Sequence, residues 1–258
     1  MHRVGSQACP IQICQMRSFT RKIATVPLIR DGFFKALFHD PSDPKKIISF
    51  LNAVKGYEGS EKIQDVVFRD PYFPAFTSKE KTIITDVICE SLGEKPEIHV
   101  VEMQQMRHEG YVKRWEFYAS RAYSTELIHQ GKYDALKKVH VVALMRYPIE
   151  FPNDTYRLTG VKSGAVIHET REVSLFSLSQ IPSTISRNDS LLAKWLHLIK
   201  YSGSADLNEE VLSEDPALFR AVEHAKKLCQ TPPPSIVEER RGGTPWPLLN
   251  KKVRELPP

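Results

Sequence analysis

Two runs of apolar residues joined by a turn dominate the middle of the chain, between Lys81 and Gln104. Both runs are rich in Ile and Val, and the residues that separate them, Gly-Glu-Lys-Pro at 93–96, are typical of a turn. This pattern predicts a β-hairpin. Because successive side chains of a strand point to opposite faces, Glu102 and Gln104 would share one face of the second strand, next to Asp86 on the first.

Apolar periodicity elsewhere predicts helical regions at 31–56, 108–130, 190–200 and 216–228, and strands at 62–69, 138–146, 155–159 and 172–179. In the first helical region Asp43 precedes Pro44, which predicts an N-cap followed by a proline in the first turn, and Gly56 would end the region. Asp215 and Pro216 begin the last region in the same way. The last two helices would pack as a C-terminal helical layer.

The composition allows one well-buried domain and excludes several classes of protein. With 258 residues, of which 41% are hydrophobic, the chain is long enough for a single core. No run approaches the ~18 consecutive apolar residues of a membrane-spanning helix. The four cysteines have neither the spacing of paired zinc ligands nor the density of a disulfide scaffold, so we expect a reducing, cytoplasmic location. The formal charge of +5 is compatible with a polyanionic partner.

The two ends of the chain differ from its middle. Residues 1–30 contain five Lys or Arg and no acidic residue, a composition of organelle transit peptides and of nucleic-acid-binding arms. We expect a flexible basic segment there, and organelle targeting stays open. Between 231 and 258, seven of 28 residues are Pro and nothing periodic remains, which predicts a flexible tail. The folded domain is therefore predicted at 31–230.

Asp86 and Glu102 need an explanation because they interrupt apolar strands. A buried carboxylate is costly unless it is paired or binds a cation. One explanation is a hard divalent cation held by carboxylate oxygens, with Gln104 beside it to orient a water molecule. The other is that the outer face of the hairpin is solvated, in which case both acids are ordinary surface residues.

A stripe of Arg and Tyr follows the predicted helix at 108–130. Arg107, Tyr111, Arg114, Tyr118 and Arg121 recur at intervals of four, three, four and three, so they share one face. Such a stripe can bind phosphates and stack on nucleotides, or it can be the solvated face of an amphipathic helix.

Several motifs occur in a characteristic order along the chain: FFKALF at 33–38, IISFLNAV at 47–54, TDV at 85–87, VEMQ at 101–104, RWEFYAS at 114–120 and LIHQGKYDALKKVHVVAL at 127–144. In this order they resemble the Rpn family of recombination-promoting nucleases and transposases, which belongs to the PD-(D/E)XK nuclease superfamily. The likeness covers about residues 30–230.

The resemblance implies an α/β fold with a restriction-endonuclease-like core, in which helices flank a mixed central β-sheet. It implies a metal-dependent DNA endonuclease that hydrolyses phosphodiester bonds in recombination or transposition. Asp86, Glu102 and Gln104 would be the catalytic residues. Mg²⁺, or alternatively Mn²⁺, would be held by Asp86, Glu102 and the backbone carbonyl of Met103.

The same resemblance extends the expected site to two helices. Arg114 and Tyr118 match the family pattern, and with Arg121 they would orient the site or contact the DNA. An acid on the first helix supports the metal site in many members of the superfamily, which makes Asp31 a candidate. Lys35, one helical turn further on, is a second candidate for supporting the site or contacting DNA. The alternative for both residues is an ordinary ion pair between them or a solvated helix face.

The chain departs from the superfamily motif at Gln104, where lysine is common. A glutamine can position water but cannot take a proton or add positive charge to a transition state. The Rpn-like family does resemble this chain in using E-x-Q. The alternative function is a catalytically inactive nuclease-fold module that binds DNA or protein, a decayed transposase. Because a double-strand break takes two cuts, a homodimer is compatible with the nuclease hypothesis, and no membrane partner is expected.

Overall fold

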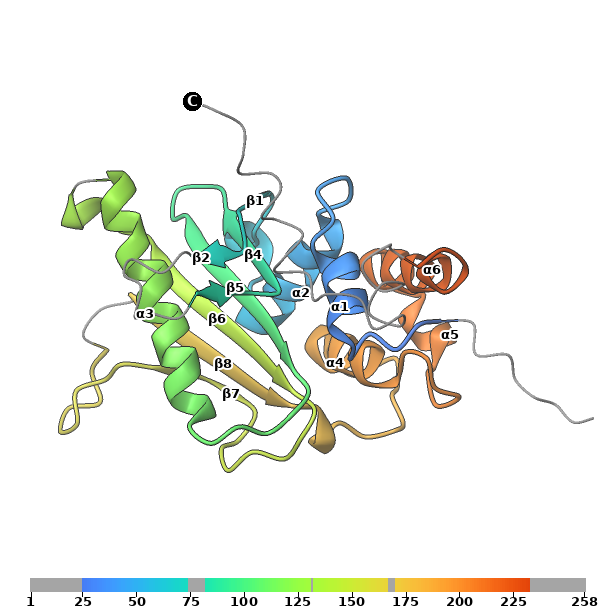
Figure 1. Cartoon of the computed structure of the whole chain (residues 1–258). Coiled ribbons are helices and arrows are strands. Elements are labelled where there is room, and N and C mark those ends of the chain that lie inside the picture. Colours follow the sequence, from blue (N-terminus) through green and yellow to red (C-terminus); the bar gives the residue numbers. More distant parts are fainter. Residues whose placement is uncertain (1–24, 74–81, 131, 167–169, 233–258) are drawn as a thin grey trace, which may run out of the picture.

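The computed structural model of the protein describes residues 25–73, 82–130, 132–166 and 170–232. Its centre is a six-stranded sheet flanked by helices (Figure 1). From one edge to the other the strands are β1 (Val66–Phe68), β4 (Val87–Ser91), β5 (Glu97–Gln104), β6 (Lys138–Met145), β8 (Arg171–Ser177) and β7 (Asp154–Arg157). Strands β5, β6 and β8 are parallel, whereas β1, β4 and β7 pair antiparallel with their neighbours. The predicted α/β fold with a mixed central sheet is confirmed.

Helices cover both faces of this sheet. Helix α3 (Tyr111–Gln130) packs on one face, where Trp115 and Ala119 lie in a cluster with Val100 and Val141. The other face carries the helices α1 (Asp31–Phe38), α2 (Lys45–Lys55), α4 (Leu191–Tyr201), α5 (Glu209–Leu212) and α6 (Pro216–Gln230). Alternation along β5 therefore directs Val100 and Glu102 toward α3, and Val101 and Met103 toward the helical layer.

The predicted hairpin forms, but its first strand is shorter than expected. Strands β4 and β5 pair antiparallel with Val87 opposite Val101. Upstream, β3 (Ile83–Ile84) pairs instead with β2 (Tyr72–Phe73) in a separate two-stranded sheet. Between the two sheets, the Thr85 N–H donates to the Pro71 carbonyl at 2.9 Å, which takes it out of the β4–β5 ladder. The prediction of one continuous strand through Asp86 is therefore wrong, and Lys81 lies outside the described residues.

The first helical region consists of two helices joined by a turn. Pro44 rather than Asp43 is the N-cap of α2, so the predicted cap is displaced by one residue. The Asp43 carboxylate pairs with the buried Lys46 ammonium at 3.3 Å instead of accepting from the backbone. Gly56 ends α2 as predicted, in the left-handed conformation with φ of 66°.

The C-terminal helical layer is confirmed as α4 and α6. Asp215 caps α6 by accepting from the N–H groups of Ala217 and Leu218 at 2.9 and 3.0 Å, and Ser190 caps α4. The short helix α5 and the single 3-10 turns at Gly59–Glu61, Tyr133–Ala135 and Leu178–Gln180 have too few residues to produce a periodic pattern. Among the described helices, none combines the length and the apolar character that crossing a bilayer requires.

Residues 25–30 belong to the packed structure, although the sequence assigned them to the N-terminal segment. Val26 and Leu28 are buried in the core that α1, α4 and α6 share. The Ser202 hydroxyl donates to the Val26 carbonyl at 2.6 Å, just after α4. Gly203 lies so close that a Cβ at this position would stand 2.8 Å from the Pro27 nitrogen. The segment that leads into α1 is thus held against the end of α4.

Candidate active site

Asp86 and Glu102 lie side by side where β4 begins and β5 ends. The Asp86 N–H donates to Oε1 of Glu102 at 3.1 Å, and the Met103 N–H donates to Oδ2 of Asp86 at 2.7 Å. Asp86 is 6% exposed and Glu102 is 4% exposed. The alternative of two solvated surface acids is therefore wrong, because the pair is enclosed between the sheet and its helices.

The environment of the pair disfavours two negative charges. Burial is the main cause that raises the pKa of Asp86, although the Lys35 ammonium acts in the opposite direction. Burial and then the neighbouring Asp86 carboxylate raise the pKa of Glu102 well above its ordinary value. Two carboxyl groups that share a dry site cannot both ionise at low cost without a compensating cation.

Lys35 supplies part of this compensation from α1. Its Nζ lies 3.0 Å from Oδ1 of Asp86, and its side chain is 33% exposed. Asp31 acts in the opposite direction, because its negative charge helps to raise the pKa of Asp86. The ion pair expected between Asp31 and Lys35 is replaced by the pair between Lys35 and Asp86. Lys35 thus connects the first helix to the acidic pair.

The side chain of Gln104 is hydrogen-bonded to Arg114 and to the backbone. Its Nε2 donates to the Met106 carbonyl at 2.9 Å, and its Oε1 accepts from Nη1 of Arg114 at 2.9 Å. The Nε of Arg114 donates to the Tyr118 hydroxyl at 3.0 Å. Arg114 also opposes the rise in the pKa of Glu102, which places its positive charge near that carboxyl.

The Arg and Tyr stripe divides between the core and the site. Tyr111 and Tyr118 are buried with Trp115 between α3 and the sheet, so the helix does not present them as an exposed stacking surface. Arg107 lies before the helix and pairs with Glu150 in solvent. Arg121 follows Arg114 by about two helical turns, and its part in the site stays a prediction.

The acidic pair fits a hard divalent cation. Oxygen ligands from carboxylates suit Mg²⁺ and Mn²⁺, and a cation there would offset the charge that burial and proximity make costly in Asp86 and Glu102. The role of the Met103 carbonyl stays a prediction. The bond from its N–H to Asp86 does hold this part of β5 next to the pair.

A second group that could hold a metal lies at the opposite end of β5. Ligand atoms of Glu97, His99 and His140 are all within 4.8 Å of one another. Glu97 and Glu102 are five residues apart on one strand, which separates the two groups by about 16 Å. Glu97 and His99 were not predicted as a group, because one Glu and one His within an apolar strand have no distinctive spacing.

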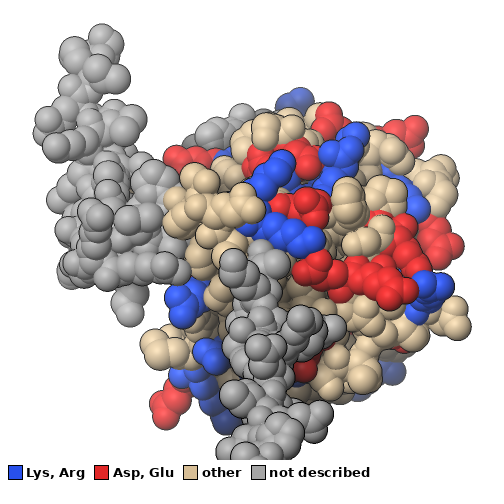
Figure 2. All heavy atoms as spheres, turned by 90° about the vertical axis from the view of Figure 1, so that its right-hand side faces the viewer, with Lys and Arg blue, Asp and Glu red and all other residues tan. Residues whose placement is uncertain are grey.

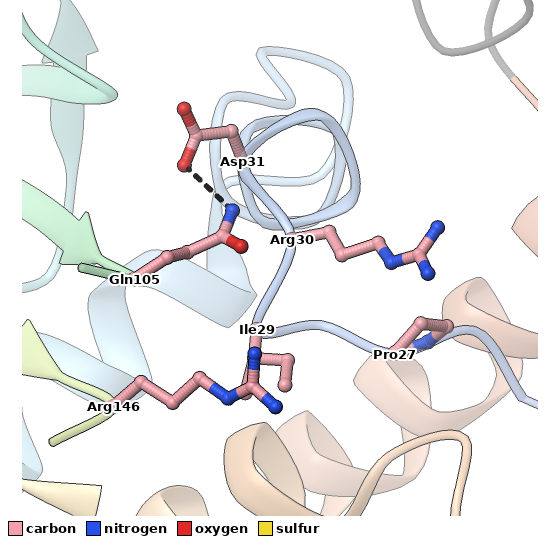
Figure 3. A pocket seen from close by; sticks show the side chains of 6 residues that line it. All are labelled: Pro27, Ile29, Arg30, Asp31, Gln105 and Arg146. Carbon is pink, nitrogen blue, oxygen red and sulfur yellow. Dashed lines mark hydrogen bonds between the residues drawn. The ribbon is translucent and has the colours of Figure 1, made fainter. Parts of the chain in front are cut away.

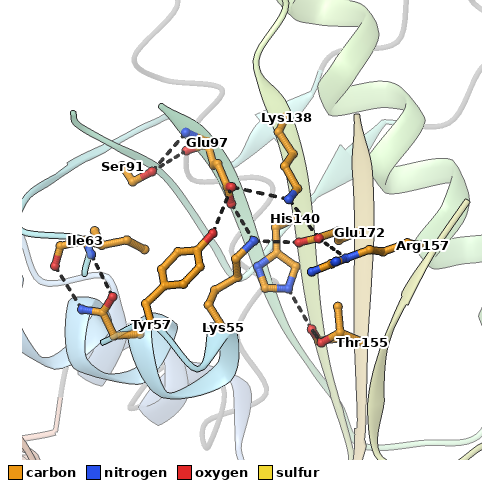
Figure 4. Close-up of polar contacts among 12 residues, drawn as sticks. Lys55, Tyr57, Ile63, Ser91, Glu97, Lys138, His140, Thr155, Arg157 and Glu172 are labelled. Carbon is orange, nitrogen blue, oxygen red and sulfur yellow. Dashed lines mark hydrogen bonds and ion pairs between the residues drawn. The ribbon is translucent and has the colours of Figure 1, made fainter. Parts of the chain in front are cut away.

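Charge argues against a cation in this second group. Figure 4 shows Lys55 between Glu97 and Glu172, with its Nζ 2.9 Å and 2.7 Å from their carboxylates. Lys138 and Arg157 also pair with Glu172. Three cations thus already neutralise two carboxylates, and a metal ion would add to an existing excess of positive charge.

The two buried histidines of this group are neutral at physiological pH. Burial lowers the pKa of His99 to about 3 and lowers that of His140 well below its ordinary value. Nε2 of His140 shares a hydrogen bond of 2.8 Å with the Ser174 hydroxyl. A fully buried ring with this bond is typical of a structural histidine.

A mixed sheet flanked by helices, with two buried acids at the end of a central hairpin, defines a restriction-endonuclease-like class of protein. Residues 28–241 match the model of the PD-(D/E)XK nuclease family transposases, and the chain belongs to this family. The membership confirms the resemblance seen in the sequence and supports a function related to nucleases and transposases. No curated protein and no solved structure matches the chain.

Proposed function

We propose that the protein is a magnesium-dependent DNA endonuclease that cuts phosphodiester bonds in recombination or transposition. The observation that carries the proposal is the buried pair of Asp86 and Glu102, joined by the bond from the Asp86 N–H to Oε1 of Glu102, with the pKa of each carboxyl raised mainly by burial. Family membership supports the same chemistry. Mn²⁺ would suit the same oxygen ligands.

The two acids and the Met103 carbonyl would hold the metal. A bound divalent ion would supply positive charge to the phosphate and make a water molecule more acidic. The Lys35 ammonium, 3.0 Å from Oδ1 of Asp86, favours the ionised form of that carboxyl. Asp86 is held in turn by the Met103 N–H, so its carboxylate has a fixed orientation.

Arg114 would stabilise charge on the phosphate that is cut. Gln104 and Tyr118 anchor two of its donors, which orients the planar guanidinium and leaves further N–H groups for a phosphate oxygen. Positive charge that a lysine supplies in many members of the superfamily would thus come from α3 in this chain. Gln104 would act by positioning Arg114.

The alternative is a nuclease-fold module that binds DNA or protein without cutting. Gln104 favours it, because an amide held by Met106 and Arg114 can neither take a proton nor supply charge. Retention of both buried acids argues for catalysis, since a binding module has no need of them.

The test is cleavage of supercoiled and linear DNA by the full chain with Mg²⁺, with Mn²⁺ and with EDTA. We expect metal-dependent cutting that Asp86→Ala and Glu102→Ala abolish while both variants stay folded by circular dichroism. Folded wild-type protein that cuts neither substrate with either metal would refute catalysis and leave the binding module. Analytical ultracentrifugation with and without DNA would test the homodimer.

A further variant locates the metal. His99→Asn removes two ring nitrogens from the second group and leaves Asp86 and Glu102 intact. We expect this variant to cut DNA at the wild-type rate. Loss of cutting in folded His99→Asn protein, together with retained cutting in Asp86→Ala, would place the metal in the histidine group instead.

A further inference from the structure

A groove opens next to the acidic pair, between the segment before α1 and the ends of β5 and β6. Its volume is about 550 Å³, and its lining residues are Pro27, Ile29, Arg30, Asp31, Gln105 and Arg146 (Figure 3). Gln105 directly follows β5, and Arg146 directly follows β6. Sequence periodicity does not connect these residues, because they come from three separate segments.

The groove adjoins the acidic pair at Asp31. Asp31 lines the groove and also helps to raise the pKa of Asp86. The Nε2 of Gln105 donates to Oδ1 of Asp31 at 3.5 Å, which joins β5 to the first helix. The Arg146 N–H donates to the Gln104 carbonyl at 3.0 Å. A chain lying in the groove would therefore pass the acidic pair on the side of α1, where Lys35 contacts Asp86.

Two arginines give the groove its charge. Arg30 and Arg146 are both exposed, and within the described ranges no carboxylate forms an ion pair with either. Figure 3 shows both side chains extending toward the Pro27 end of the segment. Asp31 is the single acid among the lining residues. The remaining lining residues are neutral, so the groove carries a net positive charge.

The face formed around α5 and α6 has a different character. Figure 2 shows that Lys and Arg there are interspersed with Asp and Glu. Lys226 pairs with Glu209 and Glu223, and Arg187 pairs with Glu210 and Glu214. Cations that are already paired with carboxylates neutralise fewer phosphates and so release fewer counterions from DNA, which makes this face a poorer site for DNA than the groove.

We propose that the groove binds the sugar–phosphate backbone of the strand to be cut, with Arg30 and Arg146 each contacting a phosphate next to the scissile one. This inference rests on the proposed nuclease function and adds two residues that hold the substrate in register. Bidentate guanidinium–phosphate contacts suit such a task, because they fix orientation as well as charge. The Gln105 amide, which lies beside Asp31 in Figure 3, could donate its second N–H to the same backbone.

The framework around the groove is rigid enough for this role. The segment from Thr25 to Arg30 is tied to the end of α4, where the Gly203 N–H donates to the Thr25 hydroxyl at 2.9 Å. The Arg30 N–H donates to the Pro27 carbonyl at 3.1 Å and closes a turn just before α1. Arg30 is thus presented from a fixed backbone, as is Arg146 at the end of a central strand.

The test measures DNA binding in EDTA, where cutting is absent, as a function of salt. Labelled single-stranded and duplex oligonucleotides are titrated with the full chain and the Arg30→Ala/Arg146→Ala variant between 50 and 200 mM salt. Loss of two phosphate contacts lowers the slope of log affinity against log salt by about 1.8 on duplex and about 1.4 on single strands. If the variant and the wild type bind equally at 1 M salt, these differences in slope make the variant's affinity at 0.1 M salt about sixtyfold weaker for duplex and about 25-fold weaker for single strands.

The matched control removes the same charge from the opposite end of the sheet. Lys132 and Lys162 are exposed, and they lie before β6 and before β8, where the parallel strands begin. Lys132→Ala/Lys162→Ala should keep the wild-type slope. Arg30→Lys/Arg146→Lys keeps the charge and should restore most of the slope, which separates phosphate binding from a loss of packing.

Equal slopes for the two alanine double variants would overturn the inference, because the groove would then be no better than any basic surface. The same measurement separates it from the proposed function. If the groove variant binds DNA more weakly than the wild type but the wild type itself cuts no DNA, the groove binds DNA and the proposed catalysis is refuted. A groove variant that binds and cuts like the wild type refutes the inference and keeps the nuclease.

Discussion

Glu102→Gln should leave the metal-free protein stable and remove its response to magnesium. Glu102 is buried beside Asp86, and burial and that neighbour raise its pKa well above the ordinary value of 4.5. Glu102 is therefore protonated more readily than a free glutamate, and a protonated Glu has the charge and nearly the shape of Gln. The Gln Oε1 can still accept from the Asp86 N–H, which Glu102 binds at 3.1 Å.

The magnitude follows from these contacts. Without magnesium the substitution keeps both packing and the hydrogen bond, so the free energy of unfolding should change by less than about 1 kcal/mol. With magnesium at one hundred times its dissociation constant, the wild type gains about 2.7 kcal/mol. For a domain of this size that gain raises Tm by roughly 5–11 °C. Glu102→Gln should lose this increase.

The pH dependence has a definite sign. Because the folded pKa of Glu102 is raised, the folded state binds more protons than the unfolded state above pH 4.5, and metal-free stability falls as the pH rises toward the folded pKa. Metal binding should release a proton and become tighter as the pH rises. Glu102→Gln should abolish both effects.

Calorimetric titration with magnesium in buffers of different ionisation enthalpy measures the proton release, and differential scanning calorimetry measures Tm. Glu109→Gln is the control, since it makes the same chemical change at an exposed residue before α3. The reasoning is refuted if Glu102→Gln binds magnesium like the wild type, or if it unfolds far below the wild type without metal.

Three further substitutions test other contacts. Lys35→Met removes the cation 3.0 Å from Asp86, so the pH midpoint of magnesium binding should rise, and the affinity at high pH should increase because a competitor for the carboxylate is gone. Magnesium titration at several pH values measures both effects, and a midpoint shifted to lower pH would contradict the prediction. In Arg114→Lys the new ammonium cannot donate to Gln104 and Tyr118 at the same time, so DNA nicking should slow about 10- to 100-fold, and urea unfolding should show that the free energy of unfolding falls by about 1–3 kcal/mol. An unchanged nicking rate would exclude Arg114 from the site. Glu172→Gln breaks the buried pairs with Lys55, Lys138 and Arg157 and should cost about 3–5 kcal/mol at pH 7. The Lys55 and Lys138 contacts lower the pKa of Glu172 to about 2, so the wild type should lose this advantage as the pH falls from 4.5 toward 2, and parallel stability curves for the two proteins would count against the network.

Patterns within the sequence were enough to predict most of the core segments and to single out the two acids that interrupt the apolar strands. Continuous apolar runs predicted β5 and β6, and the caps at Ser190 and Asp215 agree with α4 and α6, because periodicity and capping are local properties. Asp86 and Glu102 were recognisable because carboxylates in apolar strands are costly. Their meeting follows from hairpin pairing alone.

The surroundings of those acids depend on contacts between distant segments, which only the folded structure reveals. The break at Thr85 depends on a bond to Pro71, which no pattern within the strand reveals. Whether Lys35 pairs with Asp31 or Asp86 depends on how α1 packs against the sheet. The hydrogen bond between Gln104 and Arg114 likewise depends on how α3 packs against the sheet. Arg30, Gln105 and Arg146 line one groove because the segment before α1 packs beside the carboxyl ends of β5 and β6. Such long-range proximity leaves no periodic signal in the chain.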